Sequence, residues 1–194
     1  AYGGRDRTPV ANAILQEELA LANAPAPLNP LGIGLCGPAI LHHGSDAQKA
    51  RYLPRMLTAQ ELWCQCYSEP GAGSDLAALA TRAEREDEVY RVNGQKIWTT
   101  NAHRSDWMFA LVRTDTECKP QQGITFLMVP MSTPGVEVKP IVSIDGLHHL
   151  NEVYFTDVRV PISNRIGEEN KGWTYAKYLL GHERTAIANV PACK

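Results

Sequence analysis

The first part of the chain carries apolar residues with the period of an α-helix. Over residues 8–24 they recur at helical spacing, which is typical of a helix with one buried face. Thr8 precedes this pattern as an N-cap, and Pro9 stands at the first helical position, where proline is favoured. The pattern therefore predicts an amphipathic helix whose apolar face consists of Ala11, Ile14, Leu15, Leu19 and Ala22.

Two further helices are predicted before residue 60. A proline-rich stretch ends the first helix, and the apolar run over residues 31–41 indicates a buried second helix. Ser45 followed three residues later by Gln48 has the form of a capping box. We therefore expect a third helix that opens near residue 46 and ends or bends near Pro54.

Beyond residue 61 the pattern changes to that of β-strands. Short runs rich in Val, Ile, Thr and aromatic residues alternate with turn signals, which predicts an antiparallel sheet in a small barrel or sandwich. Asn93-Gly94 is the strongest local turn signal and predicts a two-residue hairpin. The expected strands cover residues 62–67, 79–84, 89–92, 95–99, 107–112, 124–129, 136–141 and 152–155.

A helical pattern returns after Pro161 and extends from about residue 171 to residue 188. The order of helices, then strands, then a final helix is that of an α+β protein. We expect a partial N-terminal helical domain at residues 1–60 and a β-barrel middle domain at residues 61–165. Residues 166–194 are expected to start a C-terminal helical bundle.

Composition narrows the function classes. The 194 residues carry 19 Lys and Arg against 21 Asp and Glu, so no basic field is available to hold a nucleic acid. The apolar run at residues 107–112 is too short to span a bilayer, and the first residues lack a signal-peptide pattern. Five cysteines without CxxC spacing indicate free thiols in a reducing compartment. These features predict a cytoplasmic protein with no nucleic-acid partner and no membrane insertion.

Glu183 is a candidate general base. It falls within an apolar stripe on the last predicted helix, where a carboxylate is expected to face packed protein or a cavity. Burial raises the pKa of a carboxyl group toward the range in which it takes up protons near neutral pH. A structural salt bridge with Arg184, His182 or a residue on another helix explains the same pattern, and periodicity does not decide between a base and a salt bridge. The stripe consists of Ala176, Leu180, Ile187 and Val190.

Residues 68–75, Ser-Glu-Pro-Gly-Ala-Gly-Ser-Asp, form a glycine-rich loop between two predicted strands. The glycines allow backbone amides to approach a ligand closely, although a plain tight turn has the same composition. The loop matches neither the dinucleotide fingerprint nor the P-loop. A second polar and aromatic run, Trp-Thr-Thr-Asn at residues 98–101, ends another predicted strand and is a candidate ligand rim.

Histidine-rich positions do not predict a metal site. His42-His43 and the group of Asp145 with His148-His149 contain ligand types, but adjacent histidines project in different directions. No third ligand stands at diagnostic spacing. We therefore expect no bound metal.

Four segments, taken together, closely resemble the acyl-CoA dehydrogenase family. They are residues 67–75, 92–101, 155–161 and 167–173, and their order and spacing match as well. The resemblance covers essentially the whole chain. Within the family, the sequence looks most like bacterial enzymes of the large-subunit type that act on pimeloyl-CoA or on bulky, steroid-derived acyl-CoA thioesters.

The resemblance implies a fold and a cofactor. Members of this family have an N-terminal helical domain, a middle β-domain and a C-terminal four-helix bundle, with FAD between the last two. Carried over to this sequence, Ser68 and the neighbouring backbone from Tyr67 contact the flavin ring. Trp98 covers the ring, and Thr100 hydrogen-bonds near its reactive nitrogen. Tyr67 replaces the aliphatic residue that is common at its position.

The resemblance also implies the substrate side of the site. Gly73 and Ser74 line the route of the pantetheine arm of the acyl-CoA. Glu183 corresponds to one of two places where the family carries its catalytic glutamate, the other being a late loop of the bundle beyond Lys194. Arg184 looks like the arginine that positions the base or the CoA. The implied reaction is α,β-dehydrogenation of an acyl-CoA thioester to the trans-2-enoyl-CoA, with Glu183 removing the α-proton.

Two alternatives keep the same fold: a flavin-dependent monooxygenase, and a non-catalytic subunit of a heteromeric acyl-CoA dehydrogenase. The resemblance further implies an electron-transfer flavoprotein as oxidant, and self-association or a homologous partner subunit. The chain is shorter than the family pattern at both ends. We therefore expect these residues alone to bind FAD poorly and to dehydrogenate nothing.

Overall fold

The computed structural model describes residues 2–4 and 7–187, with side chains described except at residue 9 and residues 182–187. Helix α1 (Pro9–Leu21) begins where the sequence predicts, and Ala11 N donates to Thr8 Oγ1 at 3.2 Å. Its apolar face is open in the described structure, since Val10, Ile14 and Leu15 are 68%, 54% and 52% exposed. The amphipathic helix is confirmed, but most of its apolar face is uncovered.

The second predicted helix forms as two consecutive helical segments of different geometry. A π-helical turn, Gly32–Cys36, leads directly into helix α2 (Gly37–His43). A Cβ atom on Gly32 would lie 2.5 Å from side-chain atoms of Asn29, so this turn can close only around a glycine. Leu35, Cys36, Ala39 and Ile40 are buried, as expected for a core helix.

Helix α3 (Asp46–Leu57) opens with the predicted capping box. Gln48 N donates to Ser45 Oγ at 3.2 Å, and Ser45 N donates to Gln48 Oε1 at 2.9 Å. The helix does not end at Pro54 but passes through it to Leu57. Met56 beyond the proline is almost fully buried, and this packing offsets the backbone hydrogen bond that the proline removes.

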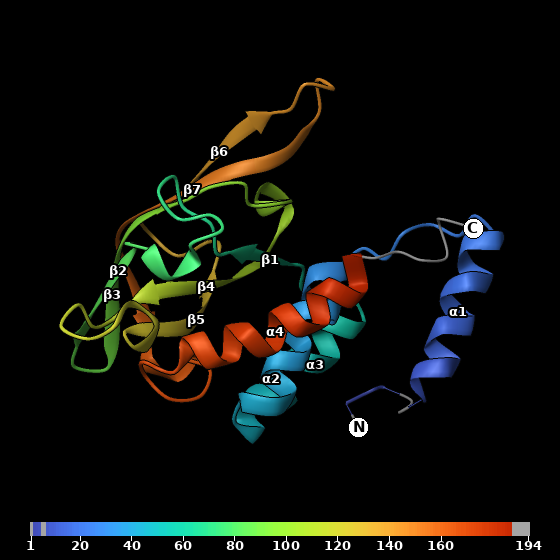
Figure 1. The fold of residues 1–194 in the computed structure, drawn as a ribbon, viewed down its shortest axis with the longest axis horizontal. Coiled ribbons are helices and arrows are strands. Elements are labelled where there is room, and N and C mark those ends of the chain that lie inside the picture. Colours follow the sequence, from blue (N-terminus) through green and yellow to red (C-terminus); the bar gives the residue numbers. More distant parts are fainter. Residues whose placement is uncertain (1, 5–6, 188–194) are drawn as a thin grey trace.

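Seven strands form one curled sheet in the middle of the chain, shown in green, yellow and orange in Figure 1. The strand order is β1-β4-β2-β3-β7-β6, and β5 pairs with β4. The strands are β1 (Trp63–Cys66), β2 (Arg82–Glu86), β3 (Val89–Lys96), β4 (Trp107–Arg113), β5 (Ile124–Pro130), β6 (Val136–Val142) and β7 (His148–Pro161).

The predicted order of helices followed by a β-domain is confirmed, but the sheet is mixed rather than wholly antiparallel. Strands β1 and β2 both run parallel to β4, whereas the other pairs are antiparallel. The residue pattern does not reveal this difference, because half-buried parallel and antiparallel strands use the same residue types. The division into residues 1–60, 61–165 and 166–194 stays a prediction.

The predicted hairpin at Asn93-Gly94 is wrong. Strand β3 runs through both residues, and the turn lies at Asp87-Glu88, where Asp87 has a φ of 51°. Asn93 sits instead at an irregularity in the pairing with β7, where its side-chain oxygen accepts a hydrogen bond from Asp157 N at 2.9 Å. The Asn-Gly pair therefore lies at a bulge, where Gly94 has a φ of 148°, a backbone conformation that other residues rarely adopt.

Short 3₁₀ turns connect several strands in the described part of the chain. They are η2 (Leu76–Ala78), η3 (Ala102–Arg104), η4 (Pro120–Gln122) and η5 (Ile162–Asn164). One predicted strand shifts as a result, since the segment expected to begin at residue 79 becomes a strand only at residue 82.

Helix α4 (Gly172–Ile187) packs between the sheet and the N-terminal helices (Figure 1). Its first residue lies against β5, where a Cβ atom on Gly172 would come within 2.8 Å of the backbone at Thr125. Tyr175, Ala176 and Leu179 are buried, while Leu180 is half-buried. The buried face is therefore displaced from the predicted stripe; the side chain of Ile187 and all of Val190 lie outside the described residues.

Two packed regions hold these elements together. One joins the π-helical turn, α2, α3 and α4 to one face of the sheet, and the other fills the inside of the curled sheet. Among the helices that the structure describes, none is long and apolar enough to cross a membrane.

Candidate cofactor site

The two motif segments singled out in the sequence meet in the structure. Ser68 is the second residue after β1, Ile97 directly follows β3, and Ile97 N donates to the Ser68 carbonyl at 2.9 Å. Trp98 then adopts a left-handed φ of 60°, which is costly for an aromatic residue. Its side chain is 57% exposed, whereas Thr99 beside it is buried. The backbone strain therefore presents an indole ring to solvent next to Ser68.

A buried ion pair lies beneath this junction. Lys96 is fully buried, and its ammonium donates to the Tyr67 carbonyl at 3.1 Å and to Glu69 Oε1 at 2.6 Å. One side chain from the end of β3 thus binds the backbone of the residue before Ser68 and the side chain of the residue after it. Lys96 and Glu69 are the positioning residues that sequence reasoning missed.

The Glu69 carboxylate is bonded on both oxygens. Ala80 N donates to Oε2 at 2.6 Å and Thr81 N donates to Oε1 at 3.0 Å. Burial acts to raise the pKa of Glu69, but the Lys96 ammonium and these two N–H groups outweigh burial and hold the pKa below its usual range. The loop after β1 is therefore tied to the start of β2 by an ionised carboxylate.

The tip of the glycine-rich loop is open. Glu69 and Ala72 exchange backbone hydrogen bonds of 2.9 and 3.0 Å, which makes a tight turn. Gly73 and Ser74 beyond it are exposed. A Cβ atom on Gly71 or Gly73 would meet no atom within 4 Å. Crowding inside the protein therefore does not require glycine at either place, and the open space leaves room for a ligand to approach the backbone.

Ser68 and the Trp98–Asn101 segment form the rim of the candidate site. The Tyr67 side chain points away from this rim into the core. Its ring meets Phe109 and Phe126 edge-on, at centroid distances of 5.7 and 6.2 Å. The same packed cluster contains Ala176 and Leu179 of α4. Tyr67 therefore contributes its backbone to the rim, and its ring connects the rim to α4. Thr100 is exposed beside Trp98.

The candidate base is placed only as far as its backbone. Glu183 and Arg184 lie in α4, but their side chains lie outside the described residues. Along this helix the buried positions 172, 176 and 179 are spaced by four and three, and position 183 continues the series by four. Position 183 therefore follows the spacing of these buried positions, and a buried Glu183 side chain stays a prediction.

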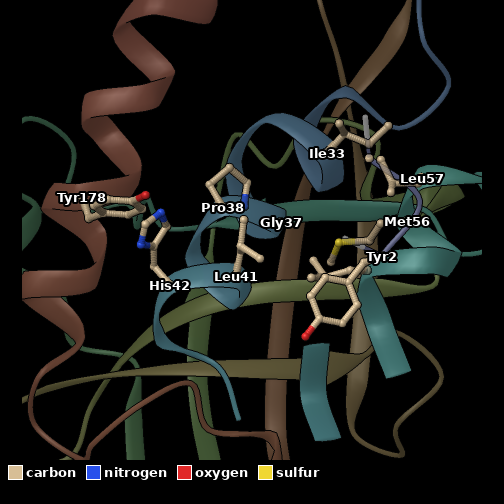
Figure 2. Close-up of a pocket in the computed structure, with 11 residues that line it drawn as sticks. Tyr2, Ile33, Gly37, Pro38, Leu41, His42, Met56, Leu57 and Tyr178 are labelled. Atoms are coloured by element: carbon tan, nitrogen blue, oxygen red, sulfur yellow. The ribbon is translucent and has the colours of Figure 1, made fainter. Parts of the chain in front are cut away.

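A separate apolar groove of about 310 Å³ lies among the N-terminal segment, α2, α3 and α4. Figure 2 shows Tyr2 and Met56 on one side of this groove and His42 with Tyr178 on the other. None of the candidate residues in the described part of the chain lines it. The groove is thus distinct from the rim formed by Ser68 and Trp98.

Comparison with known families agrees with this geometry. Residues 1–60 match the profile of the acyl-CoA dehydrogenase N-terminal domain, and residues 64–158 match that of the acyl-CoA dehydrogenase middle domain. The chain belongs to the acyl-CoA dehydrogenase family. The second match contains the whole Ser68–Asp75 loop and the Trp98–Asn101 segment, so both halves of the rim lie within the acyl-CoA dehydrogenase middle domain.

Acyl-CoA dehydrogenase IpdE1 of Mycobacterium tuberculosis is 43% identical over 183 residues, which are 94% of this chain and 48% of that protein. Among solved structures, the Tcur3481-Tcur3483 steroid acyl-CoA dehydrogenase superposes with a TM-score of 0.90 at 34% identity, covering 98% of this chain and 49% of the other. The ChsE4-ChsE5 complex from M. tuberculosis gives 0.84 at 40% identity, covering 93% and 46%. The chain spans about half the length of these relatives.

Proposed function

We propose that this chain forms the flavin-facing part of an enzyme that dehydrogenates an acyl-CoA thioester between its α and β carbons. The observation that carries the proposal is the hydrogen bond between Ile97 N and the Ser68 carbonyl, which joins two segments at residues 29 positions apart in sequence. Membership of the acyl-CoA dehydrogenase family supports the reaction type.

FAD fits the chemistry of the rim. Its flavin ring is flat and aromatic, and the exposed indole of Trp98 offers a surface for such a ring. Ser68 and Thr100 carry hydroxyl groups that can hydrogen-bond to its polar edge, and the Tyr67 backbone adjoins Ser68. Bound FAD supplies the acceptor for the hydride that leaves the β-carbon.

Glu183 is the proposed base, and it would take the α-proton onto a carboxylate oxygen. Support comes from its position in the series of buried positions along α4 and from the family resemblance. A carboxylate removed from water has a raised pKa, which strengthens it as a base. Arg184, the next residue, would hold the base or the CoA in place. Gly73 and Ser74 would line the route of the pantetheine arm.

For the substrate, we propose a bulky, steroid-derived acyl group. The name of the Tcur3481-Tcur3483 steroid enzyme, which matches 98% of this chain, supports this class. We propose a homologous second chain as partner, because the ChsE4-ChsE5 structure is a complex of two named chains. The uncovered apolar face of α1 is compatible with such an assembly. An electron-transfer flavoprotein would reoxidise the enzyme.

The test uses the complete natural protein, with any sequence that flanks this span. We expect FAD absorbance after purification, and dye reduction that is faster with a steroid side-chain acyl-CoA than with pimeloyl-CoA or a straight-chain acyl-CoA. Glu183→Gln should lower kcat by about 10²- to 10⁴-fold while FAD content stays unchanged. Glu88→Gln, at the exposed β2–β3 turn, is the matched control and should turn over normally.

Other outcomes point to other functions. Unchanged turnover in Glu183→Gln would move the base to another residue. Oxygen uptake with a flavin reductase, without dye reduction by acyl-CoA, would indicate a monooxygenase. Turnover and flavin that reside wholly in a partner chain would indicate a non-catalytic subunit.

A further inference from the structure

One buried asparagine holds the backbone of the Trp98–Asn101 segment from strand β7. Asn151 is fully buried. Thr99 N donates to the Asn151 carbonyl at 2.9 Å, and Asn151 Nδ2 donates to the Thr99 carbonyl at 2.9 Å. Asn101 N adds a hydrogen bond of 2.8 Å to the His149 carbonyl. The conformation of this segment therefore depends on residues 149–151.

The side chain of Asn151 is in turn held by two histidines. His148 Nε2 lies 2.7 Å from Asn151 Oδ1, and His103 Nδ1 lies 3.3 Å from Asn151 Nδ2. The two imidazole rings stack with their centroids 3.9 Å apart at an angle of 22°. His103 belongs to η3, the short turn that directly follows the Trp98–Asn101 segment.

These contacts fix the protonation of both rings. A carbonyl only accepts, so the Thr99 carbonyl requires the NH₂ group of Asn151 on its side; a flipped amide would place two oxygens 2.9 Å apart. Asn151 Oδ1 then accepts from His148 Nε2, which must carry a proton. Asn151 Nδ2 donates to His103 Nδ1, which must carry none. His103 is therefore neutral, with its proton on Nε2.

The surroundings of His103 favour this neutral form. Partial desolvation of the ring lowers the pKa of His103 most, and His148, Arg104 and His149 lower it further because each is a cation when protonated. Together they outweigh the hydrogen bond with Asn151, which acts to raise this pKa. His148 is stacked on the ring, Arg104 is the next residue along the chain, and His149 is on β7. A proton added to Nδ1 would set one N–H against another and would add charge beside these groups.

We propose that His103 is a positioning residue for the cofactor rim: in its neutral form it holds Asn151 against Thr99, and a proton taken from solvent onto Nδ1 releases the Trp98–Asn101 segment. The inference rests on the proposed function, because it takes Trp98 and Thr100 as flavin contacts. The affinity for FAD would then depend on pH through His103, a residue that does not itself touch the flavin.

The test is a titration of FAD into the flavin-free form of the complete natural protein between pH 5 and pH 8, followed by flavin fluorescence. In the wild type, the dissociation constant should rise as pH falls through the lowered pKa of His103, by up to about tenfold per pH unit. His103→Asn keeps an acceptor oxygen at the place of Nδ1 but cannot be protonated. In this variant the constant should change less than about twofold over the same range.

His149→Asn is the matched control. It removes a neighbouring, exposed histidine and keeps the backbone carbonyl that binds Asn101. Its FAD dissociation constant should still rise as pH falls, with the rise moved slightly to higher pH because His149 no longer lowers the pKa of His103. The same dependence on pH in the wild type and in His103→Asn would overturn the inference and leave the proposed function standing.

Two further measurements test the inference if FAD does not bind or if His103→Asn does not fold. If the wild type binds no FAD at any pH, the proposed function fails. Amide hydrogen exchange at Thr99 and Asn101 then decides: protection lost below pH 6 in the wild type and retained in His103→Asn supports the inference, and equal protection overturns it. If His103→Asn does not fold, the NMR titration of the wild-type imidazole decides, because a His103 pKa at or above 6.5 overturns the inference.

Discussion

The Lys96 ammonium lies 2.6 Å from Glu69 Oε1, and both side chains are withdrawn from water. A partly satisfied charge would be expensive at this depth, but here each group has further partners: the Tyr67 carbonyl for Lys96 and two backbone N–H groups for Glu69. The pair therefore acts as a rigid connection between the ends of β1 and β3 and the start of β2.

Removing one member of this pair should be far worse than removing a surface pair. We expect Lys96→Met to lower the free energy of unfolding by about 3–5 kcal/mol, because Glu69 would be left buried and unpaired. Lys139→Met breaks the exposed pair with Glu137 and should cost at most about 1 kcal/mol. Urea unfolding of both variants checks this, and equal losses would contradict it.

Acid should weaken the same connection. The folded pKa of Glu69 lies below its model-peptide value of 4.5, so the unfolded chain binds the extra proton first. The stabilisation is thus present above about pH 4.5 and is lost as pH falls through the lower, folded pKa. Urea midpoints measured from pH 3 to pH 6 should show a steeper loss in the wild type than in Glu69→Gln. Parallel curves would show that Glu69 does not contribute.

Removing the Gln48 side chain should lower the stability of the fold more than removing that of Ser45, the cap residue it faces. Ser45→Ala removes one capping hydrogen bond and should cost about 1 kcal/mol. Gln48→Ala should cost about 2–3 kcal/mol, because Gln48 Nε2 also donates to the Ser163 and Arg165 carbonyls, both at 2.8 Å. Thermal unfolding of the two variants shows which of them loses more stability. A larger effect for Ser45→Ala would mean that the contacts with residues 163 and 165 add nothing.

The first residue of α4 should accept no side chain. Gly172→Ala would place a methyl group 2.8 Å from the β5 backbone and should cost about 1–3 kcal/mol as the helix shifts. In Gly181→Ala, on the same helix, the new methyl group meets no atom within 4 Å. That change should be neutral or stabilising by up to about 1 kcal/mol, because alanine favours helix. Chemical denaturation of the two variants distinguishes these signs.

Features that depend on neighbouring residues, such as helix caps, can be predicted from the sequence, whereas features that depend on strand pairing cannot. The caps at Thr8 and Ser45 depend on residues three positions away, so both were predictable. The Asn93-Gly94 pair predicts a turn because this dipeptide is common in hairpins, and only the pairing with β7 shows that it lies at a bulge.

The misplaced turn also concealed part of the candidate site. With β3 continuous, Tyr90, Val92 and Lys96 fall on one buried face at even spacing, and a lysine on that face would have required a partner. Ser68 and Trp98 were found through the family resemblance. The roles of Asn151 and His103 depend on β7 lying beside η3, more than forty residues further along the chain, and no local pattern encodes that contact.

The true location of the β2–β3 turn bears on where this protein can be labelled. Asp87 and Glu88 both face solvent, so a few inserted residues carrying a fluorophore or an affinity tag would extend outward from the sheet. The sequence alone would suggest Asn93-Gly94 for this insertion. There the added residues would clash with Thr81 and Asp157 and would separate β3 from its neighbours.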